Sequence, residues 1–79
     1  MESKLDTHNV FGKTLKSLRA DVDMTQSELA YATSLDRTFI SMLERGLRQP
    51  SLYSLFKIAE AFNKKPSEIV SMMENKMDA

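Results

Sequence analysis

The sequence contains no cysteine, only two glycines, only two prolines and a single histidine among its 79 residues. Without cysteine the chain can form neither a disulfide framework nor a thiolate metal site, which fits a reducing compartment. His8 has no second histidine with which to share a metal ion. We therefore expect no metal and no cofactor.

Long apolar runs are also absent. None approaches the roughly 20 residues that a transmembrane helix needs, and Met1–Asp6 lacks the basic-then-apolar pattern of a secretory signal. The chain has no Gly-rich phosphate loop, no cluster of metal ligands and no histidine near a serine or aspartate nucleophile. These absences predict a cytoplasmic protein with no membrane association and no catalytic activity of its own.

The chain also has no formal net charge. Lysine and arginine together number 11, as do aspartate and glutamate. This balance counts against nucleic-acid binding, since such domains are often strongly basic. The distribution is uneven, however: residues 47–66 hold four basic residues and one acidic residue, whereas residues 67–79 hold one basic and three acidic. A neutral total can therefore conceal a basic side and an acidic end.

Helical spacing of apolar residues recurs along the chain, and no alternating β-branched run indicates a strand. A first helix is expected over Val10–Asp21, preceded by a loose segment, residues 1–8, with a single domain over residues 9–79. "TQSE" at Thr25 is a capping box that begins a short second helix. The apolar stripe of the first helix is expected to consist of Phe11, Leu15, Leu18 and Val22.

Three further helices follow. Ser34 or Asp36 can cap the start of a third helix, and Gly46 is suited to the left-handed conformation that often ends a helix. Ser51 can cap a fourth, and Pro66 suits the first position of a fifth. The side chains expected to point inward from the third and fifth helices are Ile40, Leu43, Ile69 and Val70.

Three short motifs occur in a fixed order: Thr-Gln-x-x-Leu-Ala, Ile-Ser-x-x-Glu-x-Gly and Pro-Ser-x-x-x-Leu. In this order and spacing the chain resembles the Cro/repressor-like, or XRE-type, helix-turn-helix family from about Phe11 to Val70. The stretch "DRTFIS" also resembles the controller proteins of restriction–modification systems. The resemblance implies an all-α, five-helix lambda-repressor-like domain that binds double-stranded DNA through its second and third helices.

The resemblance also implies a role for individual residues. Those that would read base edges from the third helix are Arg37, Thr38, Ser41 and Met42. Those that would bind backbone phosphates are Gln26, Arg45, Arg48 and Ser51. Arg19 and Glu44 match a pair that bridges the first and third helices in this family and has no direct part in reading.

The position of Arg37 supports this assignment. An arginine in the first turn of a helix opposes the helix dipole at a cost of about 0.3–1 kcal/mol. A bidentate contact with guanine contributes about 1–3 kcal/mol of discrimination, which exceeds that cost. The alternatives are that Arg37 pairs with Asp36 or another surface carboxylate, and that Met42 belongs to a protein interface. Phe39 lies between the core and the groove, and we expect it to be a core residue.

The end of the chain bears on the oligomeric state. Ile69, Met73 and Met77 recur at helical spacing, and little chain remains to cover the two methionines. We expect Met73 and Met77 to lie in a homodimer interface. A two-fold dimer would place two reading helices about 34 Å apart on a palindromic site.

The function expected is that of a dimeric, sequence-specific transcriptional regulator, with a restriction–modification controller as its narrower form and RNA polymerase as a further candidate partner. The alternative is a protein-interaction module on the same fold, such as an antitoxin or a bridging cofactor.

Overall fold

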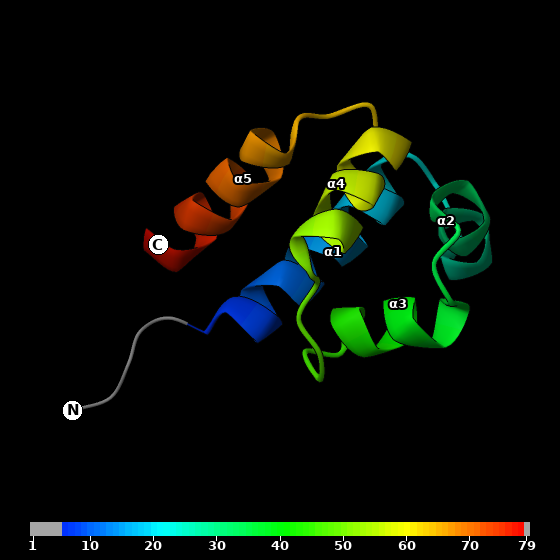
Figure 1. Cartoon of the computed structure of the whole chain (residues 1–79). Coiled ribbons are helices and arrows are strands. Elements are labelled where there is room, and N and C mark those ends of the chain that lie inside the picture. Colours follow the sequence, from blue (N-terminus) through cyan, green and yellow to red (C-terminus); the bar gives the residue numbers. More distant parts are fainter. Residues whose placement is uncertain (1–5, 79) are drawn as a thin grey trace.

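The computed structural model describes residues 6–78, which form five α-helices and no strand. The helices are α1 (Thr7–Asp21), α2 (Gln26–Thr33), α3 (Arg37–Glu44), α4 (Leu52–Ala61) and α5 (Pro66–Asp78). Figure 1 shows α2 and α3 at one end of the molecule and α5 at the other, with α1 and α4 between them. The predicted all-α, five-helix architecture is confirmed.

The first helix ends at Asp21, as predicted, but starts earlier than predicted. It begins at Thr7 instead of Val10, because the Asp6 carboxylate accepts a hydrogen bond from the Asn9 N–H at 3.3 Å. Of the segment expected to be loose, residues 1–5 lie outside the described residues, and Thr7 and His8 are helical. Val22 does not complete the apolar stripe: it follows the last turn of α1 and is 56% exposed, so that prediction is wrong.

All five helices contribute to one core. Its buried apolar side chains are Phe11, Leu15, Leu18, Leu29, Ile40, Leu43, Ile58, Ala59 and Ile69. In α5 only Ile69 is buried, whereas Val70 is 41% exposed, so the prediction that Val70 points inward is wrong. Successive helix residues lie about 100° apart, so Ile69 faces the core, with Met72 and Met73 packed partly buried beside it, and Val70 points away from that side.

Gly12 sets the distance between α1 and α3. A Cβ atom on Gly12 would lie 2.6 Å from the carbonyl oxygens of both Leu43 and Glu44. No side chain fits in that space, so the middle of α1 packs directly on the last turn of α3. α3 is thereby fixed against α1, the longest of the five described helices.

Candidate nucleic-acid interface

Two capped helices and a three-residue turn form the helix-turn-helix. The Thr25 hydroxyl accepts a hydrogen bond from the Glu28 N–H at 3.0 Å, and the Thr25 N–H donates to the Glu28 carboxylate at 2.8 Å. The predicted capping box at the start of α2 is therefore confirmed. Ser34 ends α2 in the left-handed region, with φ of 61°. Asp36 caps α3 by accepting the Thr38 N–H at 3.0 Å.

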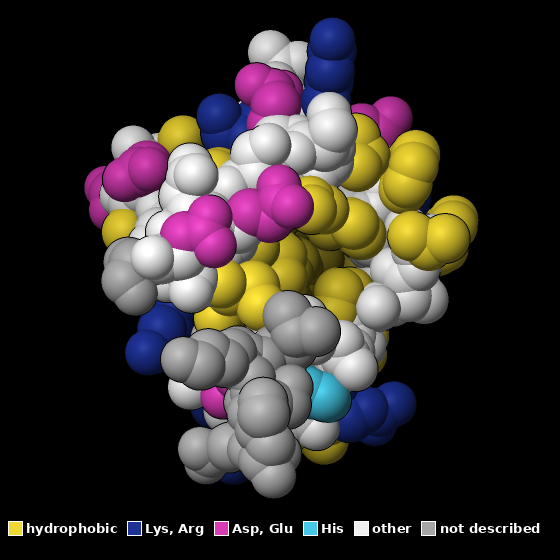
Figure 2. All heavy atoms as spheres, turned by 90° about the vertical axis from the view of Figure 1, so that its left-hand side faces the viewer, with side chains coloured by type: hydrophobic (Ala, Val, Ile, Leu, Met, Phe, Trp, Pro, Cys, Tyr) yellow, Lys and Arg dark blue, Asp and Glu magenta, His cyan; other side chains and the backbone are white. Residues whose placement is uncertain are grey.

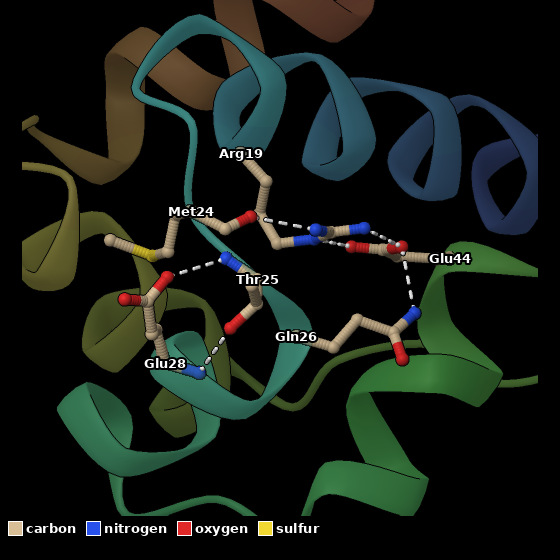
Figure 3. Close-up of polar contacts among 6 residues, drawn as sticks. All are labelled: Arg19, Met24, Thr25, Gln26, Glu28 and Glu44. Atoms are coloured by element: carbon tan, nitrogen blue, oxygen red, sulfur yellow. Dashed lines mark hydrogen bonds and ion pairs between the residues drawn. The ribbon is translucent and has the colours of Figure 1, made fainter.

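A buried ion pair joins this unit to α1. The Arg19 guanidinium donates to both carboxylate oxygens of Glu44, at 2.5 and 2.7 Å, and to the carbonyl oxygen of Met24 at 2.8 Å. Gln26 donates its side-chain amide to the same carboxylate at 3.0 Å, as Figure 3 shows. The predicted Arg19–Glu44 pair is confirmed. The Glu44 carboxylate connects α3 to α1 and α2, and the Arg19 guanidinium also connects α1 to the segment before α2.

The Glu44 side chain is 1% exposed. Because water cannot solvate it, its negative charge depends on these hydrogen-bond donors. Burial by itself raises the pKa of this carboxyl, but the hydrogen bonds from Arg19 and Gln26, together with the positive charges of Arg19 and Lys16, outweigh burial, and the pKa lies below its ordinary value. The hydrogen bond to Glu44 raises the pKa of Arg19, although burial acts in the opposite direction. Both groups are therefore held in their charged forms.

The outer side of α3 carries the predicted base-reading residues. Ile40 and Leu43 are fully buried, and this fixes the rotation of the helix about its axis. Arg37 and Thr38 are exposed at its first turn, and Ser41 and Met42 are half-buried farther along. The four candidate base-reading residues therefore lie on one short helix whose first turn is exposed.

A shallow depression lies where the first turns of α2 and α3 meet. It is lined by Arg19, Asp23, Met24, Thr25, Gln26, Ser27 and Arg37. The first N–H groups of a helix carry partial positive charge, and here they adjoin an arginine side chain. An anion bound in this depression would face Arg37 and the start of α2. Asp23 lies at the same place and opposes such binding.

Gln26, one of the predicted phosphate-binding residues, has part of its hydrogen-bonding capacity in use. Its side-chain nitrogen carries two hydrogens, one of which is donated to Glu44. The second hydrogen and the main-chain N–H at the start of α2 are the groups that a phosphate would meet. Glu44 therefore sets the orientation of this side chain.

The loop after α3 carries the other predicted phosphate-binding residues. Arg45 ends α3 and Arg48 follows in the loop, and both are exposed. Gly46 adopts a φ of 74°, as predicted for a left-handed helix end. The Ser51 hydroxyl accepts the Ser54 N–H at 3.0 Å and so caps α4, and it also lies 2.9 Å from the Ser54 hydroxyl, a contact in which either oxygen can donate. Ser51 can donate its hydrogen to a phosphate only when Ser54 is the donor in that contact.

Two contacts of this loop cannot be predicted from the spacing of residues in the sequence. The Arg48 guanidinium lies 5.8 Å from the centre of the Phe39 ring. The Thr7 hydroxyl donates to the side-chain oxygen of Gln49 at 2.9 Å. Phe39, expected to be a core residue, is half-buried and packs against the core from the outer side. Phe39 therefore lies beside Arg48, a predicted phosphate-binding residue, and Gln49 joins the same loop to α1.

A second surface, formed by α4, α5 and the start of α1, is apolar. It surrounds a hollow of about 200 Å³ lined by Thr7, Phe11, Gln49, Pro50, Leu55, Val70 and Met73. Figure 2 shows hydrophobic side chains gathered around this hollow. Met73 is half-buried at the hollow, and Met77 is half-buried nearer the end of α5.

Two side chains of α4 add to the exposed apolar area of the molecule: Leu52 is 76% exposed and Phe56 is 57% exposed. Neither was predicted to lie in an interface. A signal was nevertheless available, because apolar residues occur on more sides of α4 than one core can cover.

Within residues 6–78, no three histidine, aspartate or glutamate side chains lie close enough together to hold a metal ion. In the same residues, no helix combines the length and the apolar character needed to cross a membrane.

Comparison with known proteins places these surfaces in context. The model of the helix-turn-helix family matches residues 15–69. The control protein C.BamHI of Bacillus amyloliquefaciens is 35% identical over 68 residues, which cover 81% of this chain and 84% of that protein.

Solved structures of restriction–modification controller proteins are also similar to this chain. The restriction–modification controller protein C.AhdI from Aeromonas hydrophila has a TM-score of 0.73 and 37% identity, covering 76% of this chain and 91% of its own. The controller protein C.Esp1396I, solved as a tetramer in complex with its natural 35 base-pair operator, has a TM-score of 0.81 and 30% identity. That match covers 90% of this chain and 93% of the controller protein.

Proposed function

The chain belongs to the helix-turn-helix family, and we propose from its two surfaces that it is a dimeric, sequence-specific transcriptional regulator that binds a palindromic operator in the cytoplasm. The observation that carries this proposal is the exposed edge of α3. Arg37 and Thr38 stand at the open end of a helix whose opposite side is fixed by fully buried Ile40 and Leu43.

Base reading is assigned to this edge because the major groove admits an α-helix end-on. The Arg37 guanidinium has the geometry to donate two hydrogen bonds to guanine, and Thr38 can donate to a base or contact a thymine methyl group. Ser41 can hydrogen-bond to a base edge. Met42 lacks a strong polar group, so its contribution is apolar contact with thymine.

Phosphate contacts are assigned to the groups that flank α3. Gln26 and the first turn of α2 precede α3 in the chain, and Arg45, Arg48 and Ser51 follow it. A helix that enters the major groove end-on has a DNA backbone on each side, which these flanking groups would contact. The overall balance of charge is no obstacle, because the acidic end of the chain is on α5.

Dimerisation is assigned to the apolar surface of α4 and α5, with Met73 and Met77 as the predicted interface residues and Leu52, Phe56 and Val70 as additions. Exposed side chains of this size are expected to be covered by a partner. A second copy would bury them and place two α3 helices on successive turns of the major groove.

The likeness to C.BamHI and C.AhdI supports the narrower assignment to the restriction–modification controllers. C.Esp1396I binds its operator as a tetramer, which supports oligomeric operator binding by this chain. Recruitment or blocking of RNA polymerase would then depend on where the operator lies relative to the promoter.

Selection of bound duplexes from a random pool tests the proposal. We expect a palindromic sequence to be enriched, and the full chain to bind it with a Kd of about 10⁻⁸–10⁻¹¹ M at physiological salt. Affinity should fall steeply as salt rises, because bound phosphates release counterions. Equal affinity for the selected and scrambled duplexes, measured by fluorescence anisotropy, would contradict the proposal. Co-purification with a stable protein partner, without DNA affinity, would favour an interaction module.

A further inference from the structure

The side chain of Arg48 is the longest group in the loop after α3, and it lies over an aromatic ring. Its guanidinium carbon is 5.8 Å from the centre of Phe39, within the distance at which a cation is attracted to the face of a ring. Phe39 is half-buried and packs against the core, so the ring is held from below. Arg48 is exposed and free to meet a ligand from above.

The backbone of the same loop is held on its other side. Gly46 packs close to Asn9 of α1, since a Cβ atom on Gly46 would lie 3.5 Å from the Asn9 Cα atom. Gln49 accepts a hydrogen bond from Thr7 at 2.9 Å. The loop therefore contacts α1 on both sides of Arg48, through Gly46 before it and through the side chain of Gln49 after it, and the Arg48 side chain remains the part that needs positioning.

We propose that Phe39 is a positioning residue for DNA binding, whose ring holds the Arg48 guanidinium where it meets a backbone phosphate of the operator. This inference rests on the proposed function and adds Phe39 to the residues that determine affinity. An arginine side chain has many rotamers, and restricting them before binding removes part of the entropy loss on association. Phe39 itself touches no base in this account.

The matched variants are Phe39→Leu, which keeps an apolar side chain and removes the ring face, and Phe39→Tyr, which keeps the ring. An exposed contact between a cation and a ring corresponds to about a two- to fivefold change in affinity. A dimer contains two such contacts, so Phe39→Leu should weaken operator binding by about 4- to 25-fold. Phe39→Tyr should bind within about twofold of the unchanged chain.

A double-mutant cycle separates positioning from other roles. In a chain that already carries Arg48→Ala, the change Phe39→Leu should cause no further loss of affinity. If it weakens binding equally in both backgrounds, Phe39 contacts DNA or supports the fold independently of Arg48, and the inference is overturned. Thermal unfolding of each variant, measured without DNA, identifies any change of fold.

A measurement on the free protein keeps this test distinct from the proposed function. In the NMR spectrum, the Arg48 side-chain protons should be displaced upfield by the ring, and the displacement should disappear in Phe39→Leu. An Arg48 signal unaffected by the ring overturns the inference even where the operator is bound. If the signal is displaced but no duplex is preferred, the proposed function fails and the operator contact fails with it.

Discussion

The two candidate surfaces of this domain are built in opposite ways. The reading surface of α2 and α3 exposes polar and charged side chains, and a buried network of Arg19, Gln26 and Glu44 holds its helices in place. The surface formed by α4 and α5 exposes apolar side chains such as Leu52 and Phe56, and it carries an exposed ion pair between Lys57 and Glu60, at 3.6 Å.

The difference teaches how each surface depends on the rest of the molecule. A polar surface that reads a partner must be fixed before binding, because disorder in its side chains weakens every contact. An apolar surface is fixed by the partner that covers it. Damage to the network should therefore reduce the stability of the monomer, whereas damage to the apolar surface should leave the monomer stable and prevent dimerisation.

The largest expected effect follows from Glu44→Ala. This change leaves the Arg19 guanidinium without its carboxylate and Gln26 without its acceptor. Removal of one partner from a buried pair costs about 3–5 kcal/mol, a large part of the stability of a small domain. Urea unfolding followed by circular dichroism measures the loss.

The exposed pair on α4 provides the control. Glu60→Ala removes a carboxylate whose side chain is 77% exposed, and it should change the free energy of unfolding by less than about 1 kcal/mol. The double replacement Arg19→Met with Glu44→Leu should recover most of the stability lost in Glu44→Ala, since it leaves no buried charge. If Glu44→Ala and Glu60→Ala changed the free energy of unfolding equally, the proposed difference between the two surfaces would be contradicted.

The next effect concerns the apolar surface. Val70→Asp places a carboxylate at the hollow, and burying it in a dimer leaves a charge without a partner. The monomer should keep its stability because Val70 is already 41% exposed. Sedimentation velocity should show a monomer, and operator affinity should fall by roughly 100-fold because two linked binding events become one.

Asn75→Asp is the matched control for Val70→Asp. It adds the same charge to the same helix, but its residue lies about 140° around the helix axis from Val70. A dimer that persists in Val70→Asp, or that is lost in Asn75→Asp as well, would place the interface elsewhere.

These surfaces were not equally predictable from the sequence. The starts of α2, α3 and α4 were predicted because a helix cap is local: Thr25, Asp36 and Ser51 bond to residues two or three positions ahead. The Arg19–Glu44 pair spans 25 positions and was expected only from the family resemblance. Periodicity alone cannot indicate a contact of that kind.

The errors have a physical cause in tertiary packing. Val22 and Val70 continue apolar patterns in the sequence, but the helix ends before Val22 and the core is already filled beside Val70 by Ile69. The contact between Phe39 and Arg48 joins a helix to an irregular loop, whose path no pattern specifies. The assignment of individual DNA contacts to these residues remains a prediction.

Within the reading surface, Arg37 and Arg48 should differ in the kind of loss that they cause. Arg37→Ala should reduce discrimination at one base position by about 1–3 kcal/mol, because a bidentate contact is lost there. Arg48→Ala should weaken all duplexes alike and lower the slope of affinity against salt by about one per protomer. Competition assays with single-base variants of the operator distinguish the two, and a uniform loss in Arg37→Ala would contradict its role as a base reader.

The smallest expected effect is a pH dependence that belongs to the reading surface alone. Burial raises the pKa of Glu44, but the hydrogen bonds from Arg19 and Gln26 and the charges of Arg19 and Lys16 together lower it below its ordinary value of 4.5 in the folded chain. The folded state therefore binds a proton less readily than the unfolded state, and stability is lost as pH falls below about 4.5 and through the folded pKa. Above that range the contribution of Glu44 to stability is complete and constant.

In Glu44→Gln this part of the pH dependence should vanish, whereas Glu68→Gln on α5 should retain it. Urea unfolding of the three chains from pH 7 to pH 3 measures the difference, and an unchanged dependence in Glu44→Gln would mean that the network does not hold its carboxylate in the charged form.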